Sequence, residues 1–125
     1  MSTSCLISKE VGDNQYLTIY CHFDGYPWRM LKLLKESFNN ESKIDELLSL
    51  GDCSSIYDKL YPTPGVVHTF LNPQEGVTVA YNRDRGEEDC EAKVYDKFTL
   101  ARSNNDYHYL WTKDKGWEVV DWTNK

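Results

Sequence analysis

Apolar and polar side chains alternate along the first part of the chain as they do in β-strands. Cys5 to Val11 and Tyr16 to Phe23 are rich in β-branched and aromatic residues, and the turn-forming segment 12–15 separates them. In the second run the odd positions are apolar, whereas His22 shares the opposite face with the tyrosines. The pattern predicts a β-hairpin with one face turned toward the core.

Two amphipathic helices are predicted after this hairpin. Trp28 to Phe38 and Glu41 to Leu50 each place apolar residues three or four positions apart, which gives each helix one buried stripe. Pro27 suits the first turn of the first helix, where its missing N–H has no intrahelical partner, and Gly51 lies where a C-terminal cap is expected. Because the connection is short, we expect the two helices to be antiparallel.

The middle of the chain has a weaker pattern. Segment 52–74 contains several prolines and turn residues around a short apolar piece, and we expect an irregular excursion there. Gly76 to Tyr81 predicts a strand, and Asn82 to Cys90 predicts a charged loop. Lys93 to Ser103 fits a helix or a strand equally well.

The last part of the chain predicts a second hairpin and completes the architecture. Its strands are Tyr107 to Thr112 and Trp117 to Thr123, and Gly116 can adopt the positive φ that the turn between them requires. The order of elements predicts an α+β fold in one domain spanning residues 1–125. It would contain an antiparallel sheet of four to five strands with two helices against one face, and strands from the two ends of the chain as neighbours.

Charge and composition narrow the range of partners. The chain has 20 acidic and 14 basic side chains and a net charge of −6, which argues against sequence-independent binding to nucleic acid. The same acidity suits a basic partner, or simply aids solubility. No apolar run reaches the roughly 18 residues that span a bilayer, and the first residues lack a secretion signal, so we expect a cytoplasmic protein without a membrane partner.

The cysteines predict neither a zinc site nor a redox site. Cys5, Cys21, Cys53 and Cys90 are far apart, and no two of them form a C-x-x-C pair. We expect reduced, mostly buried thiols, although an even count would also allow two disulfides. No cofactor is expected, because the chain has no P-loop, dinucleotide fingerprint or H-E-x-x-H motif.

One group of chemically versatile side chains lies where the first hairpin ends and the first helix begins. It consists of His22, Asp24 and Tyr26. The N–H groups at a helix start attract anions, His22 exchanges a proton near neutral pH, and Asp24 could orient that imidazole or cap the helix. The structural alternatives are a hydrogen-bonded surface histidine and a turn aspartate.

A second group is Arg83, Asp84 and Arg85 in the predicted charged loop. The two arginines could clamp a phosphate or a carboxylate, with acidic neighbours to hold them in place. The alternative is a solvated loop whose charges pair among themselves. The acids at 87–91 could hold a divalent cation, but they lack the spacing of a calcium loop, so no metal site is predicted.

Aromatic residues are concentrated near the end of the chain. Tyr107, Tyr109 and Trp111 share one face of their predicted strand. Such a row usually belongs to the core, whereas an exposed row would form a stacking platform for bases or a protein-binding patch.

Three segments resemble a family of small proteins encoded by phages and prophages. They are CHFDGYP at 21–27, LGDCSS at 50–55 and YNRDRGE at 81–87. The segments occur in the family's order and, with their apolar spacers, cover most of the chain. The resemblance implies a phage origin and a compact fold, and it assigns no catalytic residue.

Because small accessory phage proteins often act on the host, the resemblance implies a role in counter-defence or host takeover, in the host cytoplasm. The hypothesis we favour is non-catalytic sequestration of a phosphorylated, nucleotide-type ligand. The two groups described above would hold the phosphate, while an aromatic side chain stacks on the base. Sequestering proteins are often built from several copies, so a homo-oligomer is compatible with this hypothesis.

Two other functions fit the same sequence. A protein-directed inhibitor would use an acidic, aromatic surface to cover a basic site on a host defence enzyme, such as a CRISPR or other immune nuclease. A small hydrolase or nuclease would use His22 and Asp24 as acid and base. The inhibitor predicts a large exposed aromatic patch, and the enzyme predicts a cleft that joins the two groups.

Overall fold

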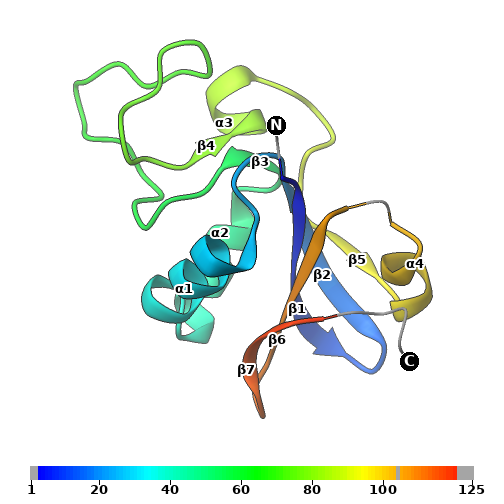
Figure 1. The fold of residues 1–125 in the computed structure, drawn as a ribbon. Coiled ribbons are helices and arrows are strands. Elements are labelled where there is room, and N and C mark those ends of the chain that lie inside the picture. The colour runs from blue at the N-terminus through cyan, green and yellow to red at the C-terminus, as the bar shows by residue number, and fades with distance from the viewer. Residues whose placement is uncertain (1–2, 104, 121–125) are drawn as a thin grey trace.

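The computed structural model describes residues 3–103 and 105–120, in which seven strands form one sheet accompanied by four helices (Figure 1). The strands are β1 (Cys5–Gly12), β2 (Gln15–Cys21), β3 (Cys53–Ser55), β4 (Val79–Ala80), β5 (Lys93–Tyr95), β6 (Tyr107–Thr112) and β7 (Gly116–Val119). The helices are α1 (Pro27–Ser37), α2 (Glu41–Ser49), α3 (Tyr81–Arg85) and α4 (Lys97–Ala101). The predicted α+β class is confirmed.

The sheet is mixed, not antiparallel throughout. Its strand order is β4-β3-β2-β1-β6-β7, with β1 antiparallel to β2 and parallel to β6. β2 uses its other edge twice, for β5 at residues 16–18 and for β3 at Cys21. The sheet exceeds the four to five strands predicted because β3 and β5 have only three residues each, too few to show alternation. The strand predicted at Gly76 to Tyr81 is present only at Val79–Ala80, as β4. The predicted pairing of strands from the two ends of the chain is confirmed by β1 and β6.

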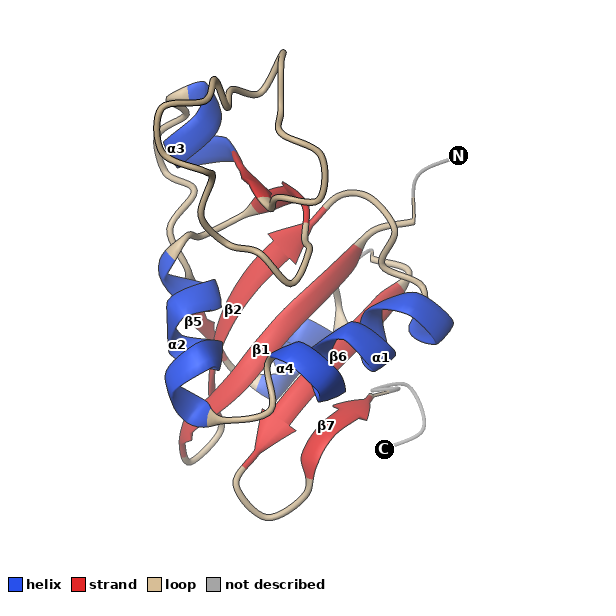
Figure 2. Cartoon of the chain, turned by 90° about the vertical axis from the view of Figure 1, so that its left-hand side faces the viewer, coloured by secondary structure: helices blue, strands red, loops and turns tan. Residues whose placement is uncertain are grey.

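The main core lies between the sheet and the helices α1 and α2, which stand in front of the sheet in Figure 2. Leu31 of the stripe predicted for the first helix is only partly buried. The other residues of both stripes are buried in this core, together with Met30 and the inward residues of the strands. These residues are Ile7, Ile19, Met30, Leu34, Phe38, Ile44, Leu47 and Leu48. Trp117 of β7 closes the core, and its indole Nε1 donates a 2.8 Å hydrogen bond to the Phe38 carbonyl.

Local signals in the sequence determine where these helices begin and end. Pro27 occupies the first turn of α1. Asn40 caps α2 by accepting a 2.9 Å hydrogen bond from the Lys43 amide. Gly51 follows α2 with φ +79°, and a Cβ there would lie 2.2 Å from the Cys90 carbonyl oxygen. Both the left-handed backbone and the close approach therefore require glycine at this position.

The opposite face of the sheet has a smaller core under α4, whereas the predicted helices were expected on one face. Leu6, Tyr16 and Leu100 form its centre. The segment 93–103, which fitted a helix or a strand, contains one of each. Asp96 divides them, because its side chain accepts a 2.8 Å hydrogen bond from the Thr99 amide and thus caps α4.

The predicted C-terminal hairpin is present as β6 and β7, with Gly116 at φ +70°. The end of its predicted second strand, including Trp122, lies outside the described residues. The aromatic row of β6 belongs to the main core, since Tyr109 is 1% exposed and Tyr107 and Trp111 pack against the same cluster. These three rings therefore do not form a stacking platform.

The four cysteines are free and buried, as predicted. Cys5, Cys21 and Cys53 come from three adjacent strands, and burial raises the pKa of the Cys53 thiol. In the described part of the chain, no helix has both the length and the apolarity needed to cross a membrane.

Candidate functional site

His22 lies at the end of β2, on the face that the alternation predicted. A 2.6 Å hydrogen bond joins its Nδ1 to the hydroxyl of Tyr20, two residues earlier on the same face. The ring of Phe23 lies edge-on to the imidazole, with the ring centroids 4.4 Å apart. Backbone hydrogen bonds from His22 and Phe23 to β3 continue the strand pairing. Tyr20 therefore orients the imidazole.

Asp24 belongs to the turn that leads into α1. It has φ +59°, and its carbonyl accepts a 3.2 Å hydrogen bond from the Arg29 guanidinium. The N-cap of α1 is Tyr26, two residues later, and no side chain caps this helix. The role in the turn is thus the one that the geometry supports, and the carboxylate of Asp24 is not hydrogen bonded to His22 in the described structure.

Tyr26 stands at the start of α1. Its ring stacks on that of Trp28, with centroids 4.3 Å apart and planes inclined by 29°. Its carbonyl accepts the Met30 amide hydrogen bond at 2.8 Å, which begins the helix.

Arg83 and Asp84 lie on the short helix α3, where the sequence predicted a loop. The guanidinium of Arg83 donates to the Thr78 carbonyl at 2.7 Å, to the Leu60 carbonyl, and to Asp84 at 3.0 Å. These bonds fasten the long excursion between β3 and β4 to α3. The guanidinium that we expected to bind a phosphate is occupied by protein groups.

Asp84 completes this buried network. Its carboxylate accepts hydrogen bonds from the Ala80 amide at 2.8 Å and from His68 Nε2 at 3.2 Å. Since His68 Nδ1 accepts from the Gln74 amide, Nε2 carries the proton of the neutral ring. Burial favours a higher pKa for Asp84, but hydrogen bonds from Arg83 and Ala80 and the nearby charges outweigh it, so the pKa lies below its ordinary value.

Arg85 is the exposed member of the second group. Its guanidinium lies 4.6 Å from the centroid of the Phe70 ring and 3.3 Å from the Glu87 carboxylate. It lines a cavity of about 490 Å³ together with Thr69, Phe70, Leu71 and Asp84. Because β2 pairs with β3, β3 with β4, and α3 follows β4, the two predicted groups lie at the same end of the sheet (Figure 1).

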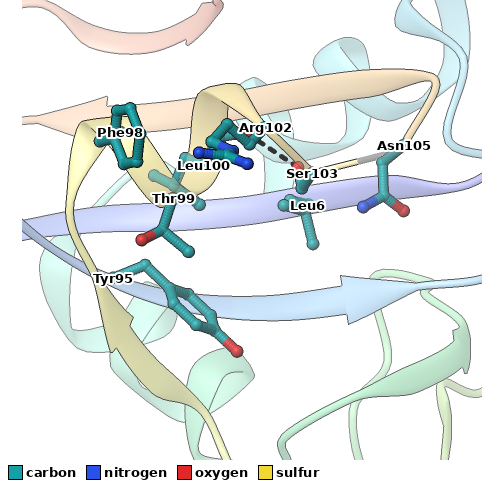
Figure 3. Close-up of a pocket in the computed structure, with 8 residues that line it drawn as sticks. All are labelled: Leu6, Tyr95, Phe98, Thr99, Leu100, Arg102, Ser103 and Asn105. Atoms are coloured by element: carbon teal, nitrogen blue, oxygen red, sulfur yellow. Dashed lines mark hydrogen bonds between the residues drawn. The ribbon is translucent and has the colours of Figure 1, made fainter.

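A larger cavity, which the sequence did not predict, lies beside α4. We call it the α4 pocket; its volume is about 570 Å³. Figure 3 shows Leu6 between Tyr95 at one end and Asn105 at the other. The lining residues are Leu6, Tyr95, Phe98, Thr99, Leu100, Arg102, Ser103 and Asn105. An apolar floor from β1 and α4 is thus combined with polar side chains at the rim.

Arg102 gives the α4 pocket its charge. The guanidinium lies 4.9 Å from the centroid of the Phe98 ring. The side chains of the other three arginines bind protein oxygens, whereas the guanidinium of Arg102 has no hydrogen bond or ion pair among residues 3–103 and 105–120. Its five N–H donors are therefore available to an anion, and the aromatic ring beneath holds the guanidinium plane in position.

Two further polar groups lie close to the pocket. The Ser103 hydroxyl donates to the Leu100 carbonyl at 2.8 Å and lies 3.4 Å from His108 Nε2. Burial lowers the pKa of His108, which keeps this imidazole neutral at neutral pH. Among the described residues, no group of three or more His, Cys, Asp or Glu side chains is placed to hold a metal ion.

Comparisons with family models, curated proteins and solved structures found no match to this chain.

Proposed function

We propose that this chain is a non-catalytic binding protein, and that the α4 pocket holds a small anionic ligand with a planar ring, of the phosphorylated nucleotide class. The observation that carries the proposal is the guanidinium of Arg102, which has no hydrogen-bond or ion-pair partner within the described residues and is stacked on Phe98 at the rim of a cavity of about 570 Å³. Ligand pockets commonly have volumes of about 300–1,000 Å³ and combine apolar walls with a few polar groups.

The residues that line the pocket support this choice of ligand. Arg102 can donate two parallel hydrogen bonds to a phosphate, and the amide of Asn105 can reach the polar edge of a base. The floor of Leu6 and Leu100, with Tyr95 and Phe98, offers apolar and aromatic surface to the ring.

A binding role is favoured over catalysis by what lies around the predicted acid–base pair. The His22 imidazole is hydrogen bonded to Tyr20 and not to Asp24. Among the described residues that line the α4 pocket there is no histidine, carboxylate or thiol. A ligand bound there would be sequestered without being converted. The resemblance to phage proteins supports a counter-defence purpose in the host cytoplasm, where sequestration would lower the free concentration of a nucleotide signal.

A thermal-shift screen against mononucleotides, nucleoside triphosphates and cyclic nucleotides tests the proposal. A ligand at a hundred times its dissociation constant adds about 2.7 kcal/mol of stability, or about 10 °C in melting temperature for a chain of this length. We expect Arg102→Gln to abolish the shift. Arg85→Gln is the matched control, because it removes the other guanidinium that is stacked on a phenylalanine.

Other outcomes separate the alternatives. A thermal shift that is lost in Arg85→Gln and kept in Arg102→Gln would assign the ligand to the second predicted group, which contains Arg85. Recovery of a chemically changed ligand would make the chain an enzyme. No shift with any nucleotide would refute the small-ligand proposal.

A further inference from the structure

The most exposed aromatic side chain of the described structure is Trp28 on α1, which is 77% exposed. Its ring does not move freely in solvent, because it stacks on Tyr26 at a centroid distance of 4.3 Å. An indole held in one orientation loses little conformational freedom when a partner covers it. Tryptophan is also among the residues that contribute most to protein interfaces.

The helix that carries Trp28 is firmly anchored. Met30 and Leu34 are fully buried in the main core. Arg29, the residue after Trp28, donates a 2.7 Å hydrogen bond to the Ile56 carbonyl, and its guanidinium lies 5.1 Å from the Tyr57 ring centroid. The outer side of α1, which faces the viewer together with α2 in Figure 2, is therefore preorganised.

A shallow groove of about 360 Å³ runs along this outer side. We call it the Trp28 face; its lining residues are Pro27, Trp28, Leu31, Lys32, Lys35 and Glu36. Both lysines are exposed, and neither forms an ion pair within the described part of the chain. The face thus joins apolar surface to two ammonium groups and one carboxylate, Glu36, so it is net positive in a chain whose net charge is −6.

We propose that the Trp28 face docks an acidic segment of a partner protein. An apolar side chain of that segment would fill the groove against Trp28 and Leu31. Carboxylates on either side of it would pair with Lys32 and Lys35, which are one helical turn apart. Charge complementarity is the basis for this choice, because it favours a partner opposite in sign to the face it covers.

The same charges disfavour two other occupants. In a symmetric dimer built on this face, each copy would offer two lysines but only one carboxylate, Glu36, so one lysine of each copy would remain without an opposite charge. A nucleic acid would meet only two lysines here, on a chain whose net charge is −6. The proposal places the acidic charge on the partner, whereas the sequence suggested an acidic surface on this chain that covers a basic partner.

Fluorescence anisotropy with a labelled amphipathic peptide of leucine and glutamate tests the proposal. Two further peptides replace every glutamate by glutamine or by lysine. We expect the glutamate peptide to bind most tightly, with an affinity that falls as salt is added. Trp28→Ala should weaken binding at least tenfold, and Lys32→Glu combined with Lys35→Glu should abolish the preference for glutamate.

Matched controls lie elsewhere on the surface. Leu71→Ala removes a still more exposed apolar side chain, and Lys59→Glu reverses a charge outside α1. Both should bind the glutamate peptide as the wild type does, and the melting temperature confirms that each variant folds. Absence of binding at millimolar peptide, equal binding of the lysine peptide, or full binding by Trp28→Ala would overturn the proposal.

The same variants identify the rival occupants. Single-stranded DNA bound more tightly than the peptide and lost in Lys32→Glu would assign the face to nucleic acid. A dimer detected by sedimentation in the wild type and lost in Trp28→Ala would assign it to a second copy. Either result would overturn the proposed acidic partner.

Discussion

Replacing Asp84 by alanine would test whether the α3 network is structural, as its geometry indicates. The carboxylate is 3% exposed and accepts hydrogen bonds from Arg83, His68 and the Ala80 amide. Without it, the positive charge of Arg83, whose side chain is 25% exposed, has only neutral carbonyl partners. The change therefore removes the single negative charge of a nearly buried cluster.

Breaking a buried ion pair from one side costs about 3–5 kcal/mol, and the partial exposure of Arg83 favours the lower end of that range. Small domains have a free energy of unfolding of about 5–15 kcal/mol, so a loss of about 3 kcal/mol is a large fraction of it. At an unfolding entropy of about 2.1 cal/mol/K per residue, the same loss lowers the melting temperature of a 125-residue chain by about 11 °C.

Thermal unfolding monitored by circular dichroism provides the assay. Asp58→Ala is the matched control, because Asp58 is exposed and lies on the excursion that the network fastens. We expect the control to unfold within about 2 °C of the wild type. If Asp84→Ala also unfolds within about 2 °C of the wild type, the network contributes nothing to stability and our reasoning is wrong.

The pH dependence of stability gives an independent check on Asp84. Because its pKa in the folded state lies below the ordinary value of about 3.9, its contribution is complete above that pH. The contribution is lost as the pH falls through the folded-state pKa. The difference in free energy of unfolding between wild type and Asp84→Ala should therefore shrink only below about pH 4.

Two further substitutions test other parts of the structure. Gly51→Ala adds a Cβ 2.2 Å from the Cys90 carbonyl oxygen, whereas a Cβ at Gly65, which has the same left-handed backbone, meets nothing within 4 Å. Gly51→Ala and Gly65→Ala both place a side chain on a left-handed backbone, which costs about 1–2 kcal/mol of stability. Chemical denaturation should therefore show a larger loss of unfolding free energy for Gly51→Ala. Equal losses would mean that the Cys90 carbonyl moves aside freely. Tyr109→Phe leaves the Gly25 carbonyl without the hydroxyl that donates to it and should cost about 1–3 kcal/mol, whereas Tyr107→Phe serves as the control. Burial raises the pKa of Tyr109, so the difference in free energy of unfolding between the wild type and Tyr109→Phe should shrink as the pH rises above about 10. A difference that stays constant up to about pH 11 would contradict that account.

Local rules account for the elements that the sequence predicted well. The two hairpins and the helices α1 and α2 follow from alternation, from helical spacing and from end signals such as Pro27 and Gly51. Each of these signals acts within a few residues of the chain. The capping aspartate Asp96 acts in the same way, and it would have resolved the ambiguity of the segment that contains β5 and α4.

The candidate site depends on contacts that no local pattern encodes. Arg83 is held by the carbonyls of Leu60 and Thr78, and its neighbour Asp84 by His68, which lies sixteen residues away. The α4 pocket likewise needs Leu6 from the first strand beside residues near position 100. The two arginines Arg83 and Arg85 therefore suggested a ligand clamp, although the tertiary fold uses Arg83, with Asp84, to hold its own backbone.

The parallel pairing of β1 with β6 has a consequence for how the molecule is made. The register joins Cys5 to Tyr107, so β1 receives its second neighbour only after roughly a hundred more residues have been added during synthesis. Until then the growing polypeptide carries an open β1 edge beside Ile7 and Cys5, both of which are fully buried in the finished fold. Translation that stalls before β6 would leave an intermediate with an unpaired strand edge and exposed apolar side chains. Such an intermediate would be a target for chaperones or for association with another nascent chain.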